Sequence, residues 1–462
     1  MKQLKYFTWT IICMMSILHV RAQYSGGGEA NPDLPTHQEA LQRFRDMRFG
    51  MFIHWGPVSL RGEEISWSRG REIPIEEYDD LYKEFDPVSF DAAQWVMAAK
   101  TAGMKYIIIT SRHHDGFSLW DSRYTEYDMA STPYGKGILE ELANECRKEG
   151  LEFGTYYSIC DWYRPDYPVV YPDPDYNFRE ERTMDAATMK EMENYITFMK
   201  NQLRELIEKT NTFVIWFDGE WEWAWTHQMG MDMYAYLRGL KNDILINNRV
   251  DKGREGMEDK SRSPRFAGDF ATPEQNIGAF DNQYAWETCM TIGKQWAWRP
   301  NEQLKSRREC IHTLAHTIGG DGNLLFNVGP MPDGRIEQRQ LDRLSEMGEW
   351  VSKNQEAVYG TRGGPYLPTD RMVSTRKENN IYLILLENTG GRLNLPLKEG
   401  INVQKACFLH NRKPLLLKRD RDKITITLPE ELPDKDATVV VLTVDTPASD
   451  IEEIEQQHEP YK

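Results

Sequence analysis

The alternation of strand-like and helix-like segments between residues 49 and 351 constrains the fold more than any other feature of the sequence. One helix is predicted over 90–103, where Phe90, Trp95, Val96, Ala99 and Ala102 share a face and Gly103 ends the helix. A strand of aromatic and β-branched residues follows directly at 106–110. Strands that alternate with helices at this rhythm form parallel sheets with helical crossovers. The seven or eight units that can be counted favour a closed (β/α)8-like TIM barrel over an open sheet.

The alternation of strands and helices continues up to residue 357, and strand-like runs without helices follow. Further barrel strands are predicted at 49–56, 152–158, 213–217, 243–250, 284–289 and 323–329, and helices at 42–47, 137–148, 184–209, 231–240, 301–318 and 340–351. A Gly-rich linker at 358–365 is then followed by short strand-like runs without helices, at 381–387, 403–410, 423–428 and 437–444. This change predicts a C-terminal antiparallel β-sandwich over 366–446.

The two ends of the chain have their own composition. Lys2 and Lys5 precede an apolar run over 6–18, and Val20-Arg21-Ala22 offers the small residues of a cleavage site. We therefore expect a signal peptide at 1–22, a linker at 23–40, a catalytic barrel at 41–357 and a loose acidic tail at 447–462. The alternative for the first segment is a short buried helix. Export places the mature chain in the periplasm of a Gram-negative bacterium, or outside the cell otherwise.

Charge and cysteine content exclude several classes of function. The net charge of −16 opposes binding to nucleic acid or to an anionic membrane surface, and after the leader no apolar stretch reaches the length of a membrane span. Outside the leader the chain has an odd number of cysteines without CxxC spacing, Cys146, Cys160, Cys289, Cys310 and Cys407. They cannot all pair, no zinc motif is present, and we expect mostly buried thiols.

Polar side chains gather where the predicted barrel strands end. The most apolar strand, 213–217, runs into Asp218, and its alternation places Trp216 on the same face as this carboxylate. Other strand ends carry His54, the pair His113 and His114, Tyr157, and Arg249. Taken singly, such residues are more often turn caps or core residues, but the carboxyl ends of parallel barrel strands converge on one face, which is where active sites lie.

A second carboxylate would complete a recognisable chemistry. Glu274, in a loop after Arg249, is one candidate, and Glu287 is its competitor. Two carboxylates about 5 Å apart suit retaining glycoside hydrolysis, in which one attacks the anomeric carbon and the other protonates the leaving oxygen. The 14 Trp and 22 Tyr supply ring faces on which sugars stack.

A series of motifs resembles the α-L-fucosidases of glycoside hydrolase family 29. The motifs are FGMFIHWG, RHHDGF, YYS, WFDGEW, NNRV, GDFATPE, WETCMTIGKQWAW and GNLLFNVGP, in this order between about residues 45 and 358. The resemblance implies a (β/α)8-like barrel with a C-terminal β-sandwich, retention of anomeric configuration, and no cofactor or metal. The implied partner is a fucosylated oligosaccharide or glycoprotein glycan, and assembly into a homo-oligomer is left open.

The resemblance also implies roles for individual residues. Asp218 is the nucleophile and Glu274 the general acid/base. Fucose hydroxyls are bound by His54, His113, His114, Tyr157 and Arg249, with Trp67 at the pocket edge, while Trp216 and Trp296 receive the C5 methyl group. Many members have Glu where this chain has Ser66, and Trp-Gly-Tyr where it has Trp296-Ala297-Trp298, which leaves the leaving-group preference open.

Two other classes of function compete with this interpretation. A metal-dependent barrel hydrolase could use His54, His113, His114 and Asp218 as ligands, although the closely spaced His pair of such sites is absent. A glycan-binding protein with an inactive barrel is the other alternative. The presence of both carboxylates argues against it.

Overall fold

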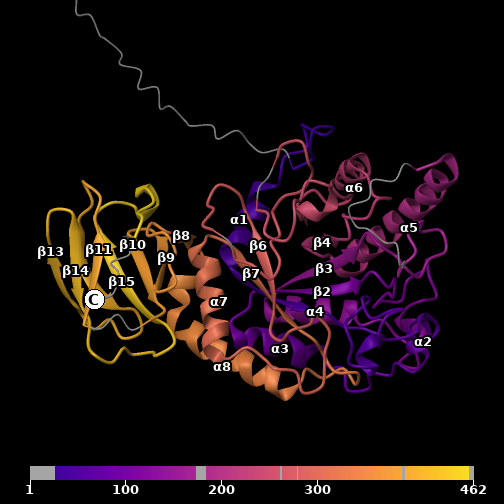
Figure 1. Cartoon of the computed structure of the whole chain (residues 1–462), viewed down its shortest axis with the longest axis horizontal. Helices are drawn as coiled ribbons and strands as arrows, with labels where there is room; N and C mark the ends of the chain where they lie inside the picture. The colour runs from indigo at the N-terminus through magenta and orange to yellow at the C-terminus, as the bar shows by residue number, and fades with distance from the viewer. Residues whose placement is uncertain (1–25, 173–183, 261–262, 278, 388–390, 457–462) are drawn as a thin grey trace, which may run out of the picture.

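The computed structural model describes residues 26–172, 184–260, 263–277, 279–387 and 391–456, so the predicted signal peptide lies outside the described residues. Figure 1 shows two bodies, a helix-covered barrel and, at the opposite end, a smaller unit of orange and yellow strands. The predicted barrel followed by an antiparallel β-sandwich is confirmed.

Among the described residues, seven parallel strands form the curled sheet of the barrel. They are β1 (Phe49–Ile53), β2 (Tyr106–Arg112), β3 (Glu152–Ser158), β4 (Val214–Asp218), β5 (Leu245–Ile246), β6 (Glu287–Thr291) and β7 (Asn323–Val328). Their order is β5-β4-β3-β2-β1-β7-β6, with every neighbouring pair parallel. The two edge strands β5 and β6 are therefore the ones that must be bridged to close the barrel.

Residues 269–272 provide this bridge, although the sequence predicts a loop there. On one side the Asp269 amide donates to the Ile246 carbonyl at 2.6 Å. On the other side the Ala271 amide donates to the Ala285 carbonyl at 3.0 Å, and the Glu287 amide returns a bond to the Ala271 carbonyl. The segment thus occupies the position of an eighth strand and leads Glu274 to the carboxyl edge of the barrel.

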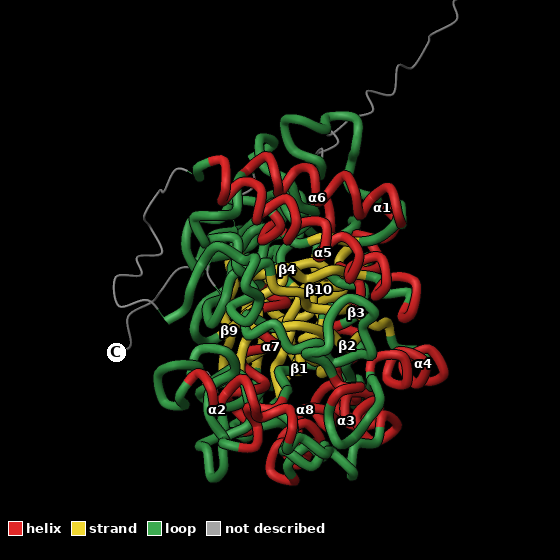
Figure 2. Tube along the Cα trace, turned by 90° about the vertical axis from the view of Figure 1, so that its right-hand side faces the viewer, coloured by secondary structure: helices red, strands yellow, loops and turns green. Residues whose placement is uncertain are grey.

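In the described part of the chain, eight α-helices surround the strands or follow them, and Figure 2 shows the helices (red) arranged around the central strands (yellow). They are α1 (Gln38–Met47), α2 (Ile75–Asp80), α3 (Ala92–Ala102), α4 (Leu139–Glu149), α5 (Ala186–Thr210), α6 (His227–Leu240), α7 (Arg307–Gly319) and α8 (Gln338–Val358). Helix α3 begins after Asp91, whose carboxylate accepts from the Ala93 amide, and ends at Gly103 with φ of 89°. Helix α1 begins within the predicted linker, because the His37 side chain caps it by accepting from the Ala40 amide.

Strand alternation divides the barrel residues between two cores. Phe52, Tyr106, Tyr156 and Trp216 pack inside the barrel, whereas their chain neighbours pack outward against the helices. Because successive side chains of a strand point to opposite faces, one residue's difference in position decides whether a side chain reaches the barrel interior.

The C-terminal domain consists of two antiparallel sheets. One contains β8 (Arg362–Gly363), β9 (Met372–Lys377), β10 (Asn380–Leu385), β12 (Val403–Phe408) and β15 (Thr438–Val444), and the other β11 (Arg392–Pro396), β13 (Leu416–Arg419) and β14 (Lys423–Thr427). Leu383, Ile426 and Val440 belong to the separate core between them. The sequence predicts four of these eight strands and misses β8, β9, β11 and β13.

The segment predicted as a linker at 358–365 is packed at the junction of the two domains. Buried Arg48 contacts Asp321 at 2.5 Å and also donates through Nε to the Thr361 carbonyl at 3.0 Å. The Gly363 amide donates to the same Asp321 carboxylate at 2.8 Å. These bonds fix the start of the sandwich to the amino-terminal edge of the barrel sheet.

The prediction of a loose tail at 447–462 is wrong for its described part. Ala448, Ile451 and Ile454 are buried, and the Leu367 amide donates to the Ile454 carbonyl at 2.8 Å. Arg376 donates to the carbonyls of Ala448 and Ile451. Burial of these three apolar side chains holds the segment against the C-terminal domain despite its acidic composition.

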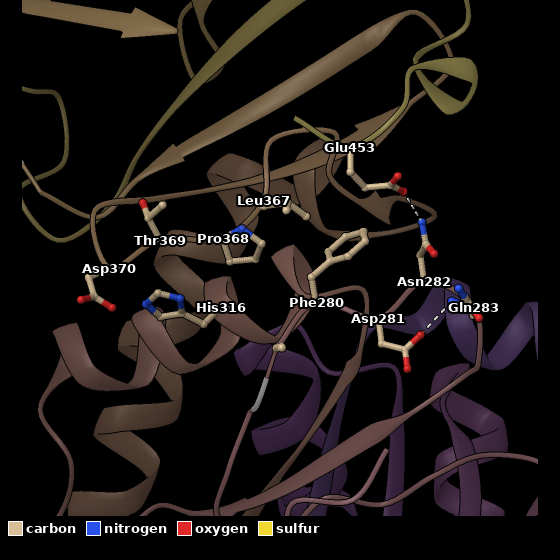
Figure 3. A pocket seen from close by; sticks show the side chains of 11 residues that line it. Phe280, Asp281, Asn282, Gln283, His316, Leu367, Pro368, Thr369, Asp370 and Glu453 are labelled. Atoms are coloured by element: carbon tan, nitrogen blue, oxygen red, sulfur yellow. Dashed lines mark hydrogen bonds between the residues drawn. The ribbon is translucent and has the colours of Figure 1, made fainter. Parts of the chain in front are cut away.

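A cavity of about 840 Å³ lies at the same junction. Figure 3 shows Phe280 beside Leu367 and Pro368, with the Asn282 amide donating to Glu453 at 2.6 Å. The Asp281 amide binds the Gly320 carbonyl just before β7, so this cavity lies toward the amino-terminal ends of the strands. Active sites of such barrels lie at the other end.

Candidate active site

A second cavity opens at the carboxyl ends of the barrel strands. It is lined by Phe52, His54, Trp67, His113, His114, Tyr156, Trp216, Asp218, Trp221, Arg249, Glu274, Cys289 and Trp296. Every residue that the sequence singles out for the site is among them except Tyr157 and the competing acid/base candidate Glu287. Asp218 and Glu274 are the carboxylates of this lining.

Arg249 joins the two carboxylates. Its Nη1 lies 2.6 Å from Asp218 Oδ1 and its Nη2 lies 2.9 Å from Glu274 Oε2. Thr272 fixes the guanidinium from behind, accepting from Nε at 2.9 Å through its hydroxyl and from Nη2 at 3.1 Å through its carbonyl. The Arg249 guanidinium also lies over the Trp216 ring, 4.5 Å from its centroid. One buried cation therefore holds both carboxylates against the same cavity.

The charges around Asp218 keep it ionised. Burial favours the neutral carboxyl, but the guanidinium groups of Arg249 and Arg254 oppose this effect and hold the pKa of Asp218 below its usual value. The other carboxylate oxygen, Oδ2, accepts from the Tyr156 hydroxyl at 3.1 Å and lies 3.7 Å from His114 Nε2. An ionised carboxylate in this position is suited to nucleophilic attack.

The sequence-based choice of Tyr157 is wrong, and its neighbour Tyr156 occupies the pocket. The Tyr157 ring lies 4.3 Å from the guanidinium carbon of Arg112, and its hydroxyl donates to Gln202 on α5 at 2.8 Å. Both tyrosines are buried, so burial does not distinguish them. The alternation of β3, in which Tyr156 pairs in register with Trp216, turns Tyr156 into the barrel.

This assignment predicts different results for two matched substitutions. Tyr156→Phe removes a hydrogen bond to Asp218 and should lower kcat/KM about 10- to 100-fold. Tyr157→Phe leaves Gln202 without its buried donor and should cost about 1–3 kcal/mol of stability while changing kcat/KM less than about threefold. Steady-state kinetics and urea unfolding of both variants measure these effects. A large loss of kcat/KM in Tyr157→Phe and none in Tyr156→Phe would contradict the placement of Tyr156 in the barrel interior.

Each of the three pocket histidines is held through its Nδ1 atom. His54 Nδ1 lies 2.6 Å from Asn327 Oδ1, His113 Nδ1 lies 2.6 Å from Ser66 Oγ, and His114 Nδ1 lies 2.7 Å from Ser158 Oγ. Burial lowers the pKa of His54 to about 3 and that of His114 to about 4, and it also holds the pKa of His113 well below its usual value. At neutral pH the cavity therefore presents uncharged imidazoles, with each Nε2 left for a ligand.

Aromatic rings form one wall of the cavity. Phe52 contacts Trp216 at a centroid distance of 5.2 Å and Trp296 at 6.0 Å. Trp296 is fixed by Glu64, which accepts from its amide at 2.9 Å, and by Asn327, which donates to its carbonyl at 2.7 Å. Trp67 lies at the mouth, stacked on Trp221 at 6.3 Å. The predicted pair Trp216 and Trp296 thus shares its surface with Phe52.

Glu287, the competing candidate for the acid/base, lies outside this cavity. It is fully buried in the barrel interior, where the Tyr106 hydroxyl contacts Oε2 and Trp216 Nε1 donates to Oε1 at 3.1 Å. Burial raises the pKa of Glu287 to about 8. Its position beneath Trp216 indicates that it supports the aromatic wall.

The raised pKa of Glu287 predicts a pH-dependent cost in stability. An ordinary Glu pKa of 4.5 in the unfolded chain and about 8 in the folded chain means that stability from this group falls as the pH rises from about 4.5 to about 8. Glu287→Gln removes that dependence. The free energy of unfolding of the wild type, relative to the variant, should fall by about 3–5 kcal/mol between pH 5 and pH 8.5. Urea unfolding at both pH values measures it, and a constant difference would refute the assignment.

Two observations on the described residues concern metal binding and membrane spans. Within this part of the chain, no group of three or more His, Cys, Asp and Glu side chains is arranged to hold a metal ion. No described helix combines the length and the apolar character that crossing a membrane requires.

Sequence reasoning misses four residues of the lining, namely Phe52, Tyr156, Trp221 and Cys289. Strand alternation could have found Phe52, which lies two residues before His54. The same alternation could have found Cys289, which follows the candidate Glu287 by two residues on β6. Trp221 follows Asp218 by three residues in a loop, so its position has no periodic signal of its own.

A parallel barrel whose strand ends carry two carboxylates and a wall of aromatic rings defines a glycoside hydrolase. A sequence model of the α-L-fucosidase family matches residues 20–356. Human tissue α-L-fucosidase is 28% identical over 426 residues, covering 84% of each chain. Among solved structures, a family 29 α-L-fucosidase of Bacteroides thetaiotaomicron, trapped as a covalent intermediate, is 28% identical with a TM-score of 0.79, covering 88% of this chain and 96% of that one. An α-L-fucosidase of Paenibacillus thiaminolyticus is 31% identical with a TM-score of 0.76, covering 88% and 99%. The chain belongs to the α-L-fucosidases of glycoside hydrolase family 29.

Proposed function

We propose that this chain removes terminal α-L-fucose from fucosylated oligosaccharides or glycoprotein glycans in two displacement steps. Asp218 is the nucleophile and Glu274 the general acid/base. The observation that carries the proposal is the bridge of Arg249 to both carboxylates at 2.6 and 2.9 Å, which places them across one small cavity. The trapped intermediate of the Bacteroides relative supports a covalent route.

In the first step the Asp218 carboxylate attacks the anomeric carbon while protonated Glu274 gives its proton to the departing glycosidic oxygen. The bond to the aglycone breaks, the aglycone leaves as an alcohol, and Asp218 becomes an uncharged ester. Arg249 then retains one charged partner, the newly ionised Glu274. In the second step Glu274 takes a proton from water, and the resulting hydroxide displaces Asp218, which returns to Arg249.

The walls of the cavity fit the shape of fucose. The neutral imidazoles of His54, His113 and His114 can exchange hydrogen bonds with ring hydroxyls without the cost of burying a charge. The surface of Phe52, Trp216 and Trp296 suits a C5 methyl group, since it offers apolar contact at the place where a hydroxymethyl group would need a partner.

Hydrolysis of 4-nitrophenyl α-L-fucoside and α-L-galactoside tests this proposal, since the two substrates differ only by a hydroxyl on C6. We expect release of 4-nitrophenol from the fucoside with kcat/KM at least about 100-fold higher than from the galactoside. If the fucoside is inert, branched fucosylated oligosaccharides are the next substrates. Fucose binding without turnover of either kind would favour the glycan-binding alternative.

We also propose that the chain is exported through cleavage of residues 1–22, and is periplasmic if its source is a Gram-negative bacterium. The proposal rests on the basic and apolar pattern of this segment. Amino-terminal sequencing of the protein from extracellular or periplasmic fractions should begin at Gln23. Recovery of the full chain from the cytoplasm would refute it.

A further inference from the structure

Ser66 lies behind the catalytic cavity without lining it. It belongs to the loop after β1, its side chain is fully buried, and its φ of 60° lies in the left-handed region that few residues other than glycine adopt readily. Its amide donates to the Tyr78 hydroxyl at 2.7 Å, and Tyr78 donates to Asp115 Oδ2 at 2.6 Å. This network holds the unusual backbone in place and points the Ser66 hydroxyl at His113.

The contacts of the Ser66 hydroxyl decide the direction of its hydrogen bond to His113. Its oxygen already accepts from the Asp115 amide at 2.9 Å and lies 2.6 Å from His113 Nδ1. Two acceptors lie near the hydroxyl hydrogen, His113 Nδ1 and the Asp115 carboxylate, which also interacts with the Ser66 side chain. The carboxylate already accepts from the Tyr78 hydroxyl at 2.6 Å and from the Phe117 amide at 3.2 Å, whereas Ser66 is the hydrogen-bond partner that the described residues give to His113 Nδ1. The short contact with His113 therefore takes the hydroxyl hydrogen, which places it on the Ser66 side. His113 then carries its own proton on Nε2.

The other two histidines have the opposite arrangement. Asn327 donates through its nitrogen to the Trp296 carbonyl at 2.7 Å, so its oxygen faces His54 Nδ1 and accepts from it. The Ser158 hydroxyl donates to the Cys160 carbonyl at 2.9 Å and therefore accepts from His114 Nδ1. In both rings Nδ1 carries the proton and Nε2 presents a lone pair.

We propose that Ser66 is a positioning residue that fixes His113 as a hydrogen-bond donor among two accepting imidazoles. This inference rests on the proposed function, because it assigns polarity to the hydroxyl contacts of the same cavity. A sugar hydroxyl against His113 Nε2 accepts, whereas hydroxyls against His54 and His114 donate. The orientation of the sugar's hydroxyl hydrogens is thereby set by residues that never touch it.

Tautomers can be observed directly in the free protein by correlating the imidazole nitrogens with their ring hydrogens in a protein labelled with ¹⁵N-histidine, at neutral pH. We expect His113 to give the pattern of an Nε2-protonated ring, and His54 and His114 that of Nδ1-protonated rings. His113→Asn assigns the His113 signals. His113 with its proton on Nδ1 would overturn the proposal, whether or not the protein hydrolyses fucosides.

Ser66→Gly is the matched variant, since glycine adopts a φ of 60° without strain and only the hydroxyl is lost. We expect the His113 signals to change to the Nδ1-protonated form or to a mixture, with His114 unchanged. Ser158→Ala should change the tautomer signals of His114 and leave those of His113 unchanged. An unchanged His113 tautomer in Ser66→Gly would overturn the proposal, and Ser66→Ala is the substitute if the glycine variant does not fold.

Kinetics supply the functional readout. Ser66→Gly should lower kcat/KM for 4-nitrophenyl α-L-fucoside about 10- to 50-fold and weaken inhibition by fucose about tenfold. With the 2-, 3- and 4-deoxy fucosides, the wild type should lose rate on each, whereas Ser66→Gly should lose its sensitivity to one of them. Equal sensitivity of both proteins to all three would contradict the proposal. An inactive wild type would refute the proposed function and leave the tautomer result standing.

Discussion

Replacing Asp218 with alanine is expected to lower kcat/KM for 4-nitrophenyl α-L-fucoside by roughly 10⁴-fold or more, as loss of a catalytic nucleophile does. The Asp218 side chain is 12% exposed at the cavity, Arg249 keeps its carboxylate ionised, and Tyr156 holds it in one orientation. Without it the covalent step has no attacking group, while His54, His113 and the aromatic wall remain to bind fucose.

Azide provides the control for this variant. It fits the space of the missing carboxylate and should restore turnover by attacking the anomeric carbon from the same side, giving the β-fucosyl azide. Fucose binding by calorimetry shows whether the cavity survives. An Asp218→Ala protein that binds fucose and retains more than about a tenth of the activity would rule out Asp218 as the nucleophile.

The second large effect is expected for Glu274→Gln, and it should depend on the leaving group. Loss of general acid catalysis costs about 10²–10⁴-fold with a sugar alcohol as leaving group, but little in the first step with 4-nitrophenolate, which needs no proton. The second step loses its base for either substrate, so the glycosyl-enzyme should accumulate. Azide should then give the α-fucosyl azide, the anomer opposite to that formed by Asp218→Ala.

Glu287→Gln is the matched control, because it makes the same change in a buried carboxyl beneath Trp216. We expect it to retain kcat/KM within about tenfold of the wild type on both kinds of substrate. If Glu287→Gln showed the leaving-group dependence and Glu274→Gln did not, the acid/base would be Glu287. The separation between these results is large enough to decide with initial rates alone.

Much of this architecture could be predicted because it depends on repeated local patterns. The helices have apolar stripes and clear ends, such as Asp91 and Gly103 of α3. Because the ends of parallel strands converge, the sequence alone also predicts that His54, Asp218 and Arg249 lie together. The position of each residue at the end of its own strand is sufficient for this step.

The choice of Tyr157 in place of Tyr156 shows that local sequence patterns do not identify every residue of the site. Strand β3 is buried on both faces, so Tyr156 and Tyr157 are equally apolar in their surroundings and hydropathy alternation disappears. Only the register of β3 with β4 selects Tyr156 for the interior, and register between distant segments is not encoded locally.

The sequence does not predict the strand-like segment at 269–272, because this segment also depends on contacts with a distant part of the chain. It is flanked by Gly268 and Pro273, and it begins with a charged residue, Asp269, in place of an apolar one. In the structure Arg238 and the Tyr234 hydroxyl neutralise and bind this carboxylate at 3.0 and 2.7 Å. Both partners lie on α6, and a sequence taken segment by segment does not reveal that pairing.

The most direct test of the proposed mechanism is the identity of the residue that becomes covalently bound to the sugar. The protein is treated with 2-fluoro-fucosyl fluoride, digested, and its peptides are compared by mass spectrometry. We expect a 2-fluorofucosyl adduct on Asp218, absent from Asp218→Ala and accumulating more fully in Glu274→Gln. An adduct on any other carboxylate, or hydrolysis of fucosides with the first product of inverted configuration, would contradict the mechanism.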